Sequence, residues 1–170
     1  MKKFITGILF SLLFSSIAIA ELDITKWYKI KPIRDDGKVY DVCGSYDADC
    51  TDIIVYDDNN TNNQKFKFRR TMWGTYTIHP KHTPSKVLDV EEGGDEHGTP
   101  VILYSQHIPN HANNFSRNKN QEFHLYRQGG DVYKIVNLGS GLSLGFDVND
   151  RVRQFFDMGV STMVELVEAY

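Results

Sequence analysis

The stretch "KVLDVEEGGDEHGTPVILYSQ", residues 86–106, repeats a pattern that occurs earlier in the chain. Its first pentad, "KVLDV" at 86–90, matches "KVYDV" at 38–42, and the aspartate has the same place in both. Self-similarity at a fixed spacing is typical of a structural unit that has been duplicated. We therefore compared the residues on either side of the two pentads.

The flanking landmarks keep the same order in both copies. Tyr56 follows Asp41 at the same spacing in the sequence as Tyr104 follows Asp89. Each copy opens on a Tyr-x-Ile segment and closes on an Asn-Gln pair, at 28–30 and 63–64 in the first copy and at 76–78 and 120–121 in the second. The second copy is longer because a Pro- and Asn-rich stretch, 107–120, precedes its Asn-Gln pair. These residues have the composition of a loop.

A third copy begins at "YKIVNLGSGLSLGF", residues 133–146. Its register places Gly145 where the other copies have an aspartate, and "VRQF" at 152–155 takes the place of the segment that ends in tyrosine. The Asn-Gln pair is missing. We expect three structural units, at about 27–70, 71–128 and 129–170, of which the third has lost its polar groups.

The pattern inside each unit predicts strands. Short runs alternate with period two and are rich in β-branched and aromatic residues, as in "KFKF" at 65–68 and "TYTIH" at 75–79. Clusters of Gly, Asp and Asn separate these runs, as turns require. Three units of about four short strands can close on themselves and leave no long exposed sheet edge. The sequence therefore predicts an all-β fold, a β-trefoil.

The N-terminal segment, 1–20, reads as a secretory signal. Lys2 and Lys3 precede an apolar run at 4–17, and "AIA" at 18–20 supplies the small residues of a cleavage site. We expect cleavage after Ala20 and a secreted or periplasmic protein, from a bacterium to judge by the short, lysine-led signal. No other segment is apolar enough to span a membrane.

The net charge and the two cysteines argue against nucleic-acid binding and against a redox or zinc site. The formal net charge of −3, which becomes −5 without Lys2 and Lys3, argues against nucleic acid as a partner. Cys43 and Cys50 are the two cysteines, and in an exported protein we expect them to form a disulfide. Their spacing differs from Cys-x-x-Cys redox motifs, and a zinc site would need more ligands.

The repeated landmarks resemble the ricin B-type lectin domain, the Q-x-W trefoil family. The second unit carries most of that family's pattern, at Tyr76, Ile78, Lys86, Leu88, Asp89, Val90, Gly98, Val101, Tyr104, Asn120, Gln121 and Phe123. The chain departs from the family where phenylalanine follows each glutamine and where tyrosine replaces the usual tryptophan. The resemblance implies a non-catalytic carbohydrate-binding protein without a cofactor, with galactose-type glycans as partners.

The residue types suit sugar recognition on physical grounds. An aromatic ring receives the C–H face of a sugar, a carboxylate accepts from two hydroxyls, and an amide can donate or accept. The candidate site of the second unit comprises Asp89, Tyr104, Asn120, Gln121 and, at the loop, His107. The candidate site of the first unit comprises Asp41, Tyr56, Asn63 and Gln64. The glutamines are expected to hold the loop and the aspartate.

Other interpretations remain open at this point. The aspartates could cap turns through nearby backbone N–H groups, and the tyrosines could be ordinary strand residues. A trefoil with a vestigial sugar site could serve as a protein-interaction module or inhibitor through its 107–120 loop. A lectin of this kind could also be the binding subunit of a toxin or adhesin, accompanied by other protein subunits.

Metal and catalytic sites find little support. The pairs His79/His82 and His107/His111 lie among prolines and are expected on surface loops. The segment 91–96 contains four acidic residues and two glycines. We expect it to form a solvated turn rather than a calcium site. A glycosidase would need two carboxyls facing one cleft, whereas Asp41 and Asp89 belong to different units. The sequence predicts neither a metal site nor an enzyme.

Overall fold

The computed structural model describes residues 21–35, 37–107 and 118–170. The predicted signal, residues 1–20, lies outside this range, as does most of the 107–120 loop. Within it, the strands are β1 (Trp27–Pro32), β2 (Lys38–Val42), β3 (Thr51–Asp57), β4 (Phe66–Arg70), β5 (Tyr76–Pro80), β6 (Lys86–Val90), β7 (Val101–Ser105), β8 (Phe123–Gly129), β9 (Val132–Asn137), β10 (Ser143–Phe146), β11 (Val152–Phe155) and β12 (Val164–Ala169). Short 3-10 turns join several strands, and the described part contains no helix with the length and apolar content of a membrane span.

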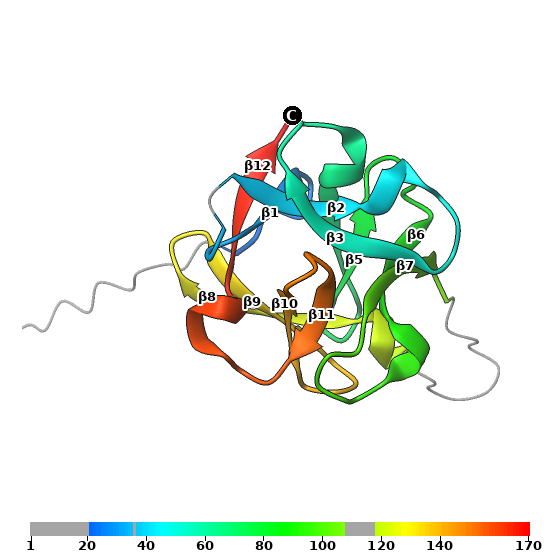
Figure 1. Cartoon of the computed structure of the whole chain (residues 1–170), viewed down its shortest axis with the longest axis vertical. Helices are drawn as coiled ribbons and strands as arrows, with labels where there is room; N and C mark the ends of the chain where they lie inside the picture. The colour runs from blue at the N-terminus through cyan, green and yellow to red at the C-terminus, as the bar shows by residue number, and fades with distance from the viewer. Residues whose placement is uncertain (1–20, 36, 108–117) are drawn as a thin grey trace, which may run out of the picture.

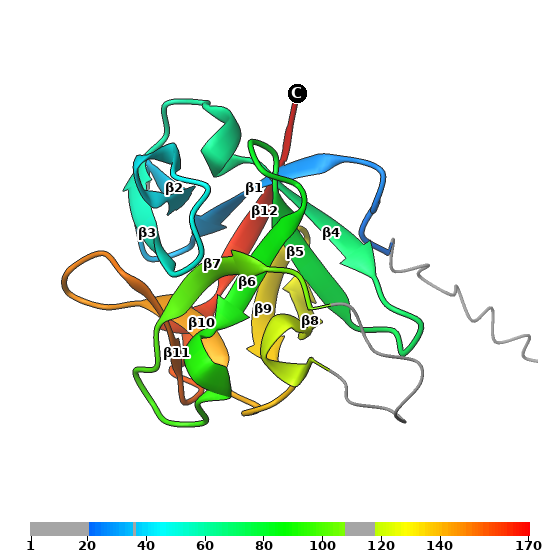
Figure 2. The ribbon, with the colours of Figure 1, turned by 90° about the vertical axis from the view of Figure 1, so that its right-hand side faces the viewer.

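Six of the strands close into a barrel (Figures 1 and 2). The order is β9-β12-β1-β4-β5-β8, and β8 pairs back to β9, so the ring of neighbours is complete. Extended antiparallel ladders alternate with shorter contacts around the ring; in one such ladder, Trp27 to Pro32 of β1 lie against Val164 to Ala169 of β12. Closure satisfies the backbone groups that an open sheet would leave at its edges.

The remaining strands form three hairpins, β2–β3, β6–β7 and β10–β11. Each hairpin contacts the next around the threefold axis. Thr51 in β3 pairs with Leu103 in β7, Pro100 bridges to Arg153 in β11, and Arg151 bridges back to Ile54 in β3. A six-stranded barrel with three hairpins is the β-trefoil that the repeats predict, so the fold class is confirmed.

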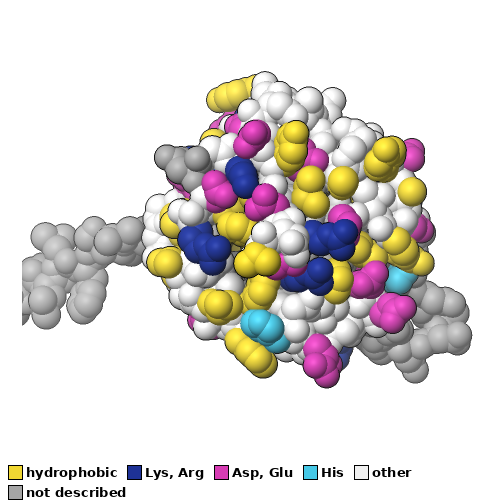
Figure 3. Space-filling model, viewed as in Figure 1, with side chains coloured by type: hydrophobic (Ala, Val, Ile, Leu, Met, Phe, Trp, Pro, Cys, Tyr) yellow, Lys and Arg dark blue, Asp and Glu magenta, His cyan; other side chains and the backbone are white. Residues whose placement is uncertain are grey.

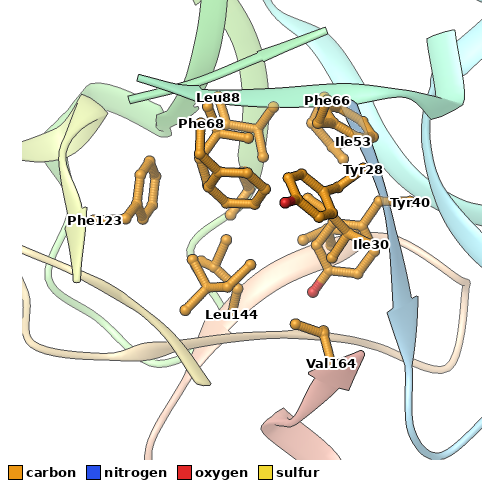
Figure 4. Close-up of a cluster of buried hydrophobic side chains, with 14 of the residues drawn as sticks. Tyr28, Ile30, Tyr40, Ile53, Phe66, Phe68, Leu88, Phe123, Leu144 and Val164 are labelled. Atoms are coloured by element: carbon orange, nitrogen blue, oxygen red, sulfur yellow. The ribbon is translucent and has the colours of Figure 1, made fainter. Parts of the chain in front are cut away.

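The hydrophobic core contains equivalent residues from each of the three units. Ile30, Ile78 and Ile135 occupy equivalent barrel positions and are 0%, 0% and 1% exposed. Large side chains from the barrel and the hairpins meet inside, among them Phe66, Phe68, Phe123, Leu88 and Leu144 (Figure 4). Each such side chain contributes roughly 1.5–3 kcal/mol when it is fully removed from water. The apolar members of the repeated motif therefore hold the barrel together and leave its polar members for other tasks.

One expectation about the histidines needs correction. His79 was expected on a surface loop, but it lies in β5 and is 0% exposed, whereas His82 lies in the turn that follows. The ring of His79 is within hydrogen-bond distance of the Thr77 hydroxyl, at 2.8 Å, and of the Pro84 carbonyl oxygen, at 3.0 Å. The prolines do not prevent the strand from forming, because Pro80 is its last residue and Pro84 lies beyond it.

The surface carries charges of both signs. On the face drawn in Figure 3, acidic and basic side chains are interspersed with hydrophobic ones. Several charged residues of the chain form ion pairs, such as Lys134 with Asp157 and Arg153 with Asp147. The face in Figure 3 therefore has no extended basic area of the kind that binds a polyanion.

Candidate functional site

The hairpin β6–β7 brings the second unit's aspartate and tyrosine to one face. Asp89 pairs directly with Ile102, and Tyr104 follows Ile102 by two residues. Paired residues and residues two apart share a face of a sheet, so Asp89, Ile102 and Tyr104 point to the same side. Leu88 and Leu103 point to the opposite side and enter the core. The equal Asp-to-Tyr spacing in the two units thus reflects a fixed cross-strand register.

The Asn-Gln pair approaches this face from the short turn η5 (Lys119–Gln121). The side-chain nitrogen of Asn120 donates to both carboxylate oxygens of Asp89, at 3.0 and 2.9 Å. The side-chain nitrogen of Gln121 donates to Asp89 at 2.7 Å and to the Ser105 carbonyl at 3.0 Å. Asp89 is 3% exposed, and its carboxylate is held by side chains rather than by its own backbone.

Gln121 also fixes the loop beside the site. Its side-chain oxygen accepts from the backbone N–H of His107 at 2.9 Å. The His107 ring lies edge-on to the Tyr104 ring, with 5.5 Å between the ring centroids. Gln121, which is 1% exposed, therefore links the aspartate, the end of β7 and the start of the loop.

These residues surround a hollow of about 430 Å³. Asp89, Tyr104, His107 and Asn120 line it together with Cys50, Glu91, Glu92, Gly93 and Ile102. Sequence reasoning did not anticipate Cys50 as a member, because it belongs to another unit. Nor did it anticipate Glu91 and Glu92, which were expected to form only a solvated turn.

Burial and neighbouring groups act in opposite directions on the pKa of the Asp89 carboxyl. Burial raises the pKa of Asp89, while the hydrogen bonds from Gln121 and Asn120 and the nearby His107 lower it. The neighbouring Asp49 raises the pKa further. Each carboxylate oxygen can accept more than one hydrogen bond, so the site can accept from ligand hydroxyls beside a ring that offers an apolar face.

The first unit has a similar but not identical arrangement. Asp41 is 4% exposed and accepts from the side-chain nitrogen of Asn63 at 2.8 Å. The same nitrogen donates to the Val42 carbonyl at 3.1 Å, so it does not grip both carboxylate oxygens as Asn120 does. Tyr56 is 52% exposed. Burial raises the pKa of Asp41, against the effect of hydrogen bonds from Gln64 and Asn63 and of nearby His82.

Gln64 repeats the role of Gln121. Its side-chain oxygen accepts from the backbone N–H of Asn59 at 3.0 Å, and its nitrogen donates to the Asp57 carbonyl at 2.8 Å. Asn59 and Asp57 stand where His107 and Ser105 stand in the second unit. The glutamine of each Asn-Gln pair therefore anchors the segment after the tyrosine strand.

The third unit offers no comparable acceptor. Gly145 pairs with Arg153 as Asp89 pairs with Ile102, and Phe155 takes the position of the tyrosines. A Cβ atom on Gly145 would lie 3.0 Å from the Phe155 ring and 3.3 Å from the Ser161 carbonyl oxygen. The space next to the backbone, where the other units carry a carboxylate, is thus filled by Phe155 and Ser161.

Cys43 and Cys50 are free thiols in this structure, so the disulfide expected from the sequence is not formed there and stays a prediction. Among the described residues, no group of three or more His, Cys, Asp or Glu side chains is arranged to hold a metal ion. His111 lies outside the described residues.

Comparison with known proteins agrees with the fold and the motifs. Residues 21–104 match the family described as "Ricin-type beta-trefoil lectin domain-like". Flavastacin from Elizabethkingia meningoseptica is 45% identical over 53 residues, which are 31% of this chain and only 12% of flavastacin. The resemblance to ricin B-type lectin domains indicated by the repeats is confirmed.

Two solved structures cover most of the chain. The designed threefold-symmetric protein ThreeFoil is similar over 83% of this chain and 97% of its own, with a TM-score of 0.71 and 28% identity. A ricin B-like lectin from Macrolepiota procera, in complex with lactose, is similar over 87% of this chain and 99% of its own, with a TM-score of 0.66 and 17% identity. The second likeness concerns the fold alone.

Proposed function

Since residues 21–104 match the ricin-type β-trefoil lectin-like family, we propose that this chain is a non-catalytic carbohydrate-binding protein, secreted or periplasmic. The second unit carries its main site and the first unit a second one. One observation carries the proposal. The buried carboxylate of Asp89 is fixed by Asn120 and lines one hollow with the ring of Tyr104.

Each group in the hollow has a task that suits a sugar. Asp89 accepts hydrogen bonds from two neighbouring hydroxyls, and charged acceptors form the stronger bonds. The ring of Tyr104 receives the C–H face of the sugar, and its edge-on contact with His107 fixes the ring's orientation. Asn120 and Gln121 already bind Asp89, so their part is to aim the carboxylate. Galactose-type glycans are the proposed ligands, supported by the lactose complex of the fungal lectin.

Binding suits this site better than cleavage. Glycoside hydrolysis needs one carboxyl that donates a proton to the leaving oxygen. Both carboxylate oxygens of Asp89 accept from amide N–H groups, which favours a permanent acceptor. A single shallow site of this kind would bind with a dissociation constant of about 1 mM, or about −4 kcal/mol. Two sites that engage a glycan-coated surface together would bind more strongly.

A glycan array probed with the chain, and with its Asp89→Asn variant, tests the proposal. Asparagine keeps the size of the side chain but removes the charge and one acceptor oxygen. We expect binding to galactose-terminated glycans, lost or reduced at least tenfold in the variant, while Asp41→Asn causes a smaller loss. Silence of the unmodified chain on every glycan would contradict the proposal.

A second candidate function is favoured by one surface feature. Phe156, Met158 and Val160, which follow β11, are 64%, 52% and 59% exposed. Exposed apolar side chains grouped in this way are typical of protein contacts. They support a protein-interaction module or inhibitor, or the docking of this chain to other subunits of a toxin or adhesin. Replacing Met158 and Val160 by serine would then abolish capture of a protein partner and leave glycan binding unchanged.

A further inference from the structure

The first unit reaches into the second unit's site. Strand β3 runs beside β7 (Figure 1), where Thr51 pairs with Leu103 and Asp52 with Ile102. Immediately before them, the backbone N–H of Cys50 donates to the Leu103 carbonyl at 2.9 Å. The end of the β2–β3 connection is therefore attached to the hairpin that carries Asp89.

Asp49 ties this connection to both strands of the hairpin. Its carboxylate accepts from Lys86 Nζ at 2.5 Å and from the backbone N–H and hydroxyl of Ser105, at 2.7 and 3.0 Å. Lys86 and Ser105 are a cross-strand pair. Lys86 lies three residues before Asp89, and Ser105 directly follows Tyr104. One carboxylate from the first unit thus clamps the end of the hairpin next to the second unit's candidate site.

The next residue, Cys50, lines the hollow itself. It is exposed, and its backbone has a φ of 64°, in the left-handed region that few non-glycine residues adopt. Cys50 is therefore part of the wall of a cavity whose other described lining residues, from Asp89 to Asn120, all belong to the second unit.

We propose that the glycan site of the second unit is built by two units, with Asp49 as a positioning residue and Cys50 as a specificity-determining wall residue. The segment Asp49–Cys50 limits the size of the sugar substituent that fits beside Asp89. The inference rests on the proposed carbohydrate-binding function. It adds that the site depends on a contact between units, which a motif within one unit does not contain.

Comparison of the three junctions between units supports a role in binding rather than in folding alone. At the junction between the third and first units, Lys38 pairs with Asp150 at 3.0 Å and also with Asp35 at 3.5 Å. Asp150, however, occupies the position of Thr51 rather than that of Asp49. At the junction between the second and third units, His97 stands in for Asp49 and accepts from the backbone N–H of Phe156 at 3.4 Å. Leu142, three residues before Gly145, replaces the lysine there.

The described residues thus show the aspartate–lysine pair at the two hairpins that keep a candidate site, and an aromatic contact at the hairpin that has lost one. His97 stacks on Phe156 with 5.2 Å between ring centroids. Arg153 and Gln154 also donate across this junction, to the backbone carbonyls of Gly98, Gly94 and Glu96. A trefoil junction can therefore be built without the ion pair. Its presence at the first and second hairpins points to a task beyond holding the fold.

Chemical labelling of Cys50 tests the inference on the folded chain. In a Cys43→Ser variant, Cys50 is the remaining thiol, and N-ethylmaleimide attaches a bulky group to it. Labelling after folding avoids the strain that a larger residue would meet at this φ. The unlabelled Cys43→Ser variant is the matched control.

We expect the labelled Cys43→Ser variant to bind lactose or a galactose-terminated glycan no better than Asp89→Asn, and the unlabelled Cys43→Ser variant to bind as the unmodified chain does. The glycan should also slow the labelling of Cys50, and this protection should vanish in a Cys43→Ser variant that carries Asp89→Asn. If the labelled variant binds as well as the unlabelled one, the inference is wrong while the proposed function stands. If the unlabelled variants bind no glycan at all, the proposed function fails, and the inference fails with it.

Discussion

The side-chain nitrogen of Asn120 lies 3.0 and 2.9 Å from the two carboxylate oxygens of Asp89 and donates to both. In the first unit, the equivalent nitrogen of Asn63 donates to one oxygen of Asp41 and to a backbone carbonyl instead. The amide of the second unit therefore holds its carboxylate through both oxygens, whereas that of the first unit leaves more freedom. This difference places the stronger candidate site in the second unit, where the hollow is also found.

Replacing Asp89 by alanine should affect both binding and stability. The variant loses the acceptor for ligand hydroxyls, so we expect glycan binding at this site to disappear. It also leaves the side-chain amides of Asn120 and Gln121 without their buried acceptor, which costs about 1–3 kcal/mol. The burial of Asp89 therefore predicts a lower melting temperature for the alanine variant.

Urea unfolding and lactose titration of the alanine and asparagine variants measure the two effects separately. Asp89→Asn keeps one acceptor oxygen and should lose less stability than Asp89→Ala, yet bind equally poorly. Equal stability of the alanine variant and the unmodified chain would show that the two amides find other partners.

The glutamines offer a matched pair of variants. Gln121→Ala removes the bonds to Asp89, to the Ser105 carbonyl and to the His107 N–H, so both stability and glycan affinity should fall. Gln64→Ala removes the corresponding bonds to Asp57 and Asn59. We expect each to lower the free energy of unfolding by about 1–3 kcal/mol.

The two glutamine variants should differ in their affinity for glycan. Gln121→Ala should weaken binding at the second unit's site, because His107 and Asp89 both lose a fixed neighbour. Gln64→Ala should leave that site intact. Isothermal titration with lactose, together with thermal unfolding, distinguishes this outcome from a general loss of structure, in which both variants would bind equally weakly.

The sequence contains enough information to predict the fold and to group Asp89, Tyr104, His107 and Asn120, which line one hollow in the structure, whereas Cys50, Glu91 and Glu92 of the same hollow were not predicted. The spacing between Asp89 and Tyr104 sets which residues pair across β6 and β7, and period-two alternation then decides which side each one faces. The glycine at 145 also indicates the loss of an acceptor in the third unit. These features are local, so they can be read from one unit at a time.

Contacts between units could not be predicted in the same way. Asp49 and Lys86 are far apart in the sequence and belong to different copies, and no spacing rule links them. The burial of His79 was missed for a related reason. Pro80 and Pro84 indicated a loop at His79. In the structure, Ile78, which precedes His79 in β5, pairs with Phe68 of β4, and this pairing places the segment in the barrel. Barrel closure overrides the local signal.

Glycan binding should depend on pH through Asp89. Burial raises the pKa of this carboxyl above its ordinary value of 3.8, so it becomes protonated at a higher pH than an exposed aspartate would. The groups that face it are Asn120, Gln121, His107 and Asp49. We expect affinity to fall as the pH is lowered through this raised pKa, with a midpoint above 3.8.

Stability should respond to Asp89 in the opposite direction. A carboxyl with a raised pKa in the folded state binds protons more readily there than in the unfolded chain, so its own contribution improves as the pH falls. Loss of binding in acid with an intact near-ultraviolet spectrum would therefore reflect titration and not unfolding. An affinity that stays constant down to pH 4 would contradict the role given to this carboxylate.

His79 should make the fold sensitive to acid. Burial lowers the pKa of its ring from 6.5 to about 4. The unfolded chain therefore takes up a proton below pH 6.5 while the folded chain does not, and stability falls as the pH drops from 6.5 to 4, by up to about 1.4 kcal/mol per pH unit. Urea unfolding between pH 7 and pH 4.5 should reveal this slope.

The His79→Gln variant tests whether His79 causes this pH dependence of stability. His79→Gln cannot take up the proton, so its unfolding free energy should vary less with pH, although its value at pH 7 should be lower because a buried ring is lost. An unchanged slope in His79→Gln would assign the acid sensitivity to other groups.

Restoring the aspartate in the third unit should not restore a site. In Gly145→Asp, the new Cβ would lie 3.0 Å from the Phe155 ring and 3.3 Å from the Ser161 carbonyl oxygen, and crowding of this kind costs about 1–3 kcal/mol. The new carboxylate would also lack the amide pair that holds Asp89. Its cross-strand neighbour Arg153 already donates to Asp147.

Gly145→Ala separates crowding from charge, because it adds the Cβ alone. We expect Gly145→Ala to be destabilised and Gly145→Asp to be destabilised further, since its carboxylate is buried without the partners that the other units supply. Lactose titration should give the same number of sites for both variants as for the unmodified chain. An additional site in Gly145→Asp would mean that a carboxylate and a ring suffice, and that the amide clamp on Asp89 is dispensable.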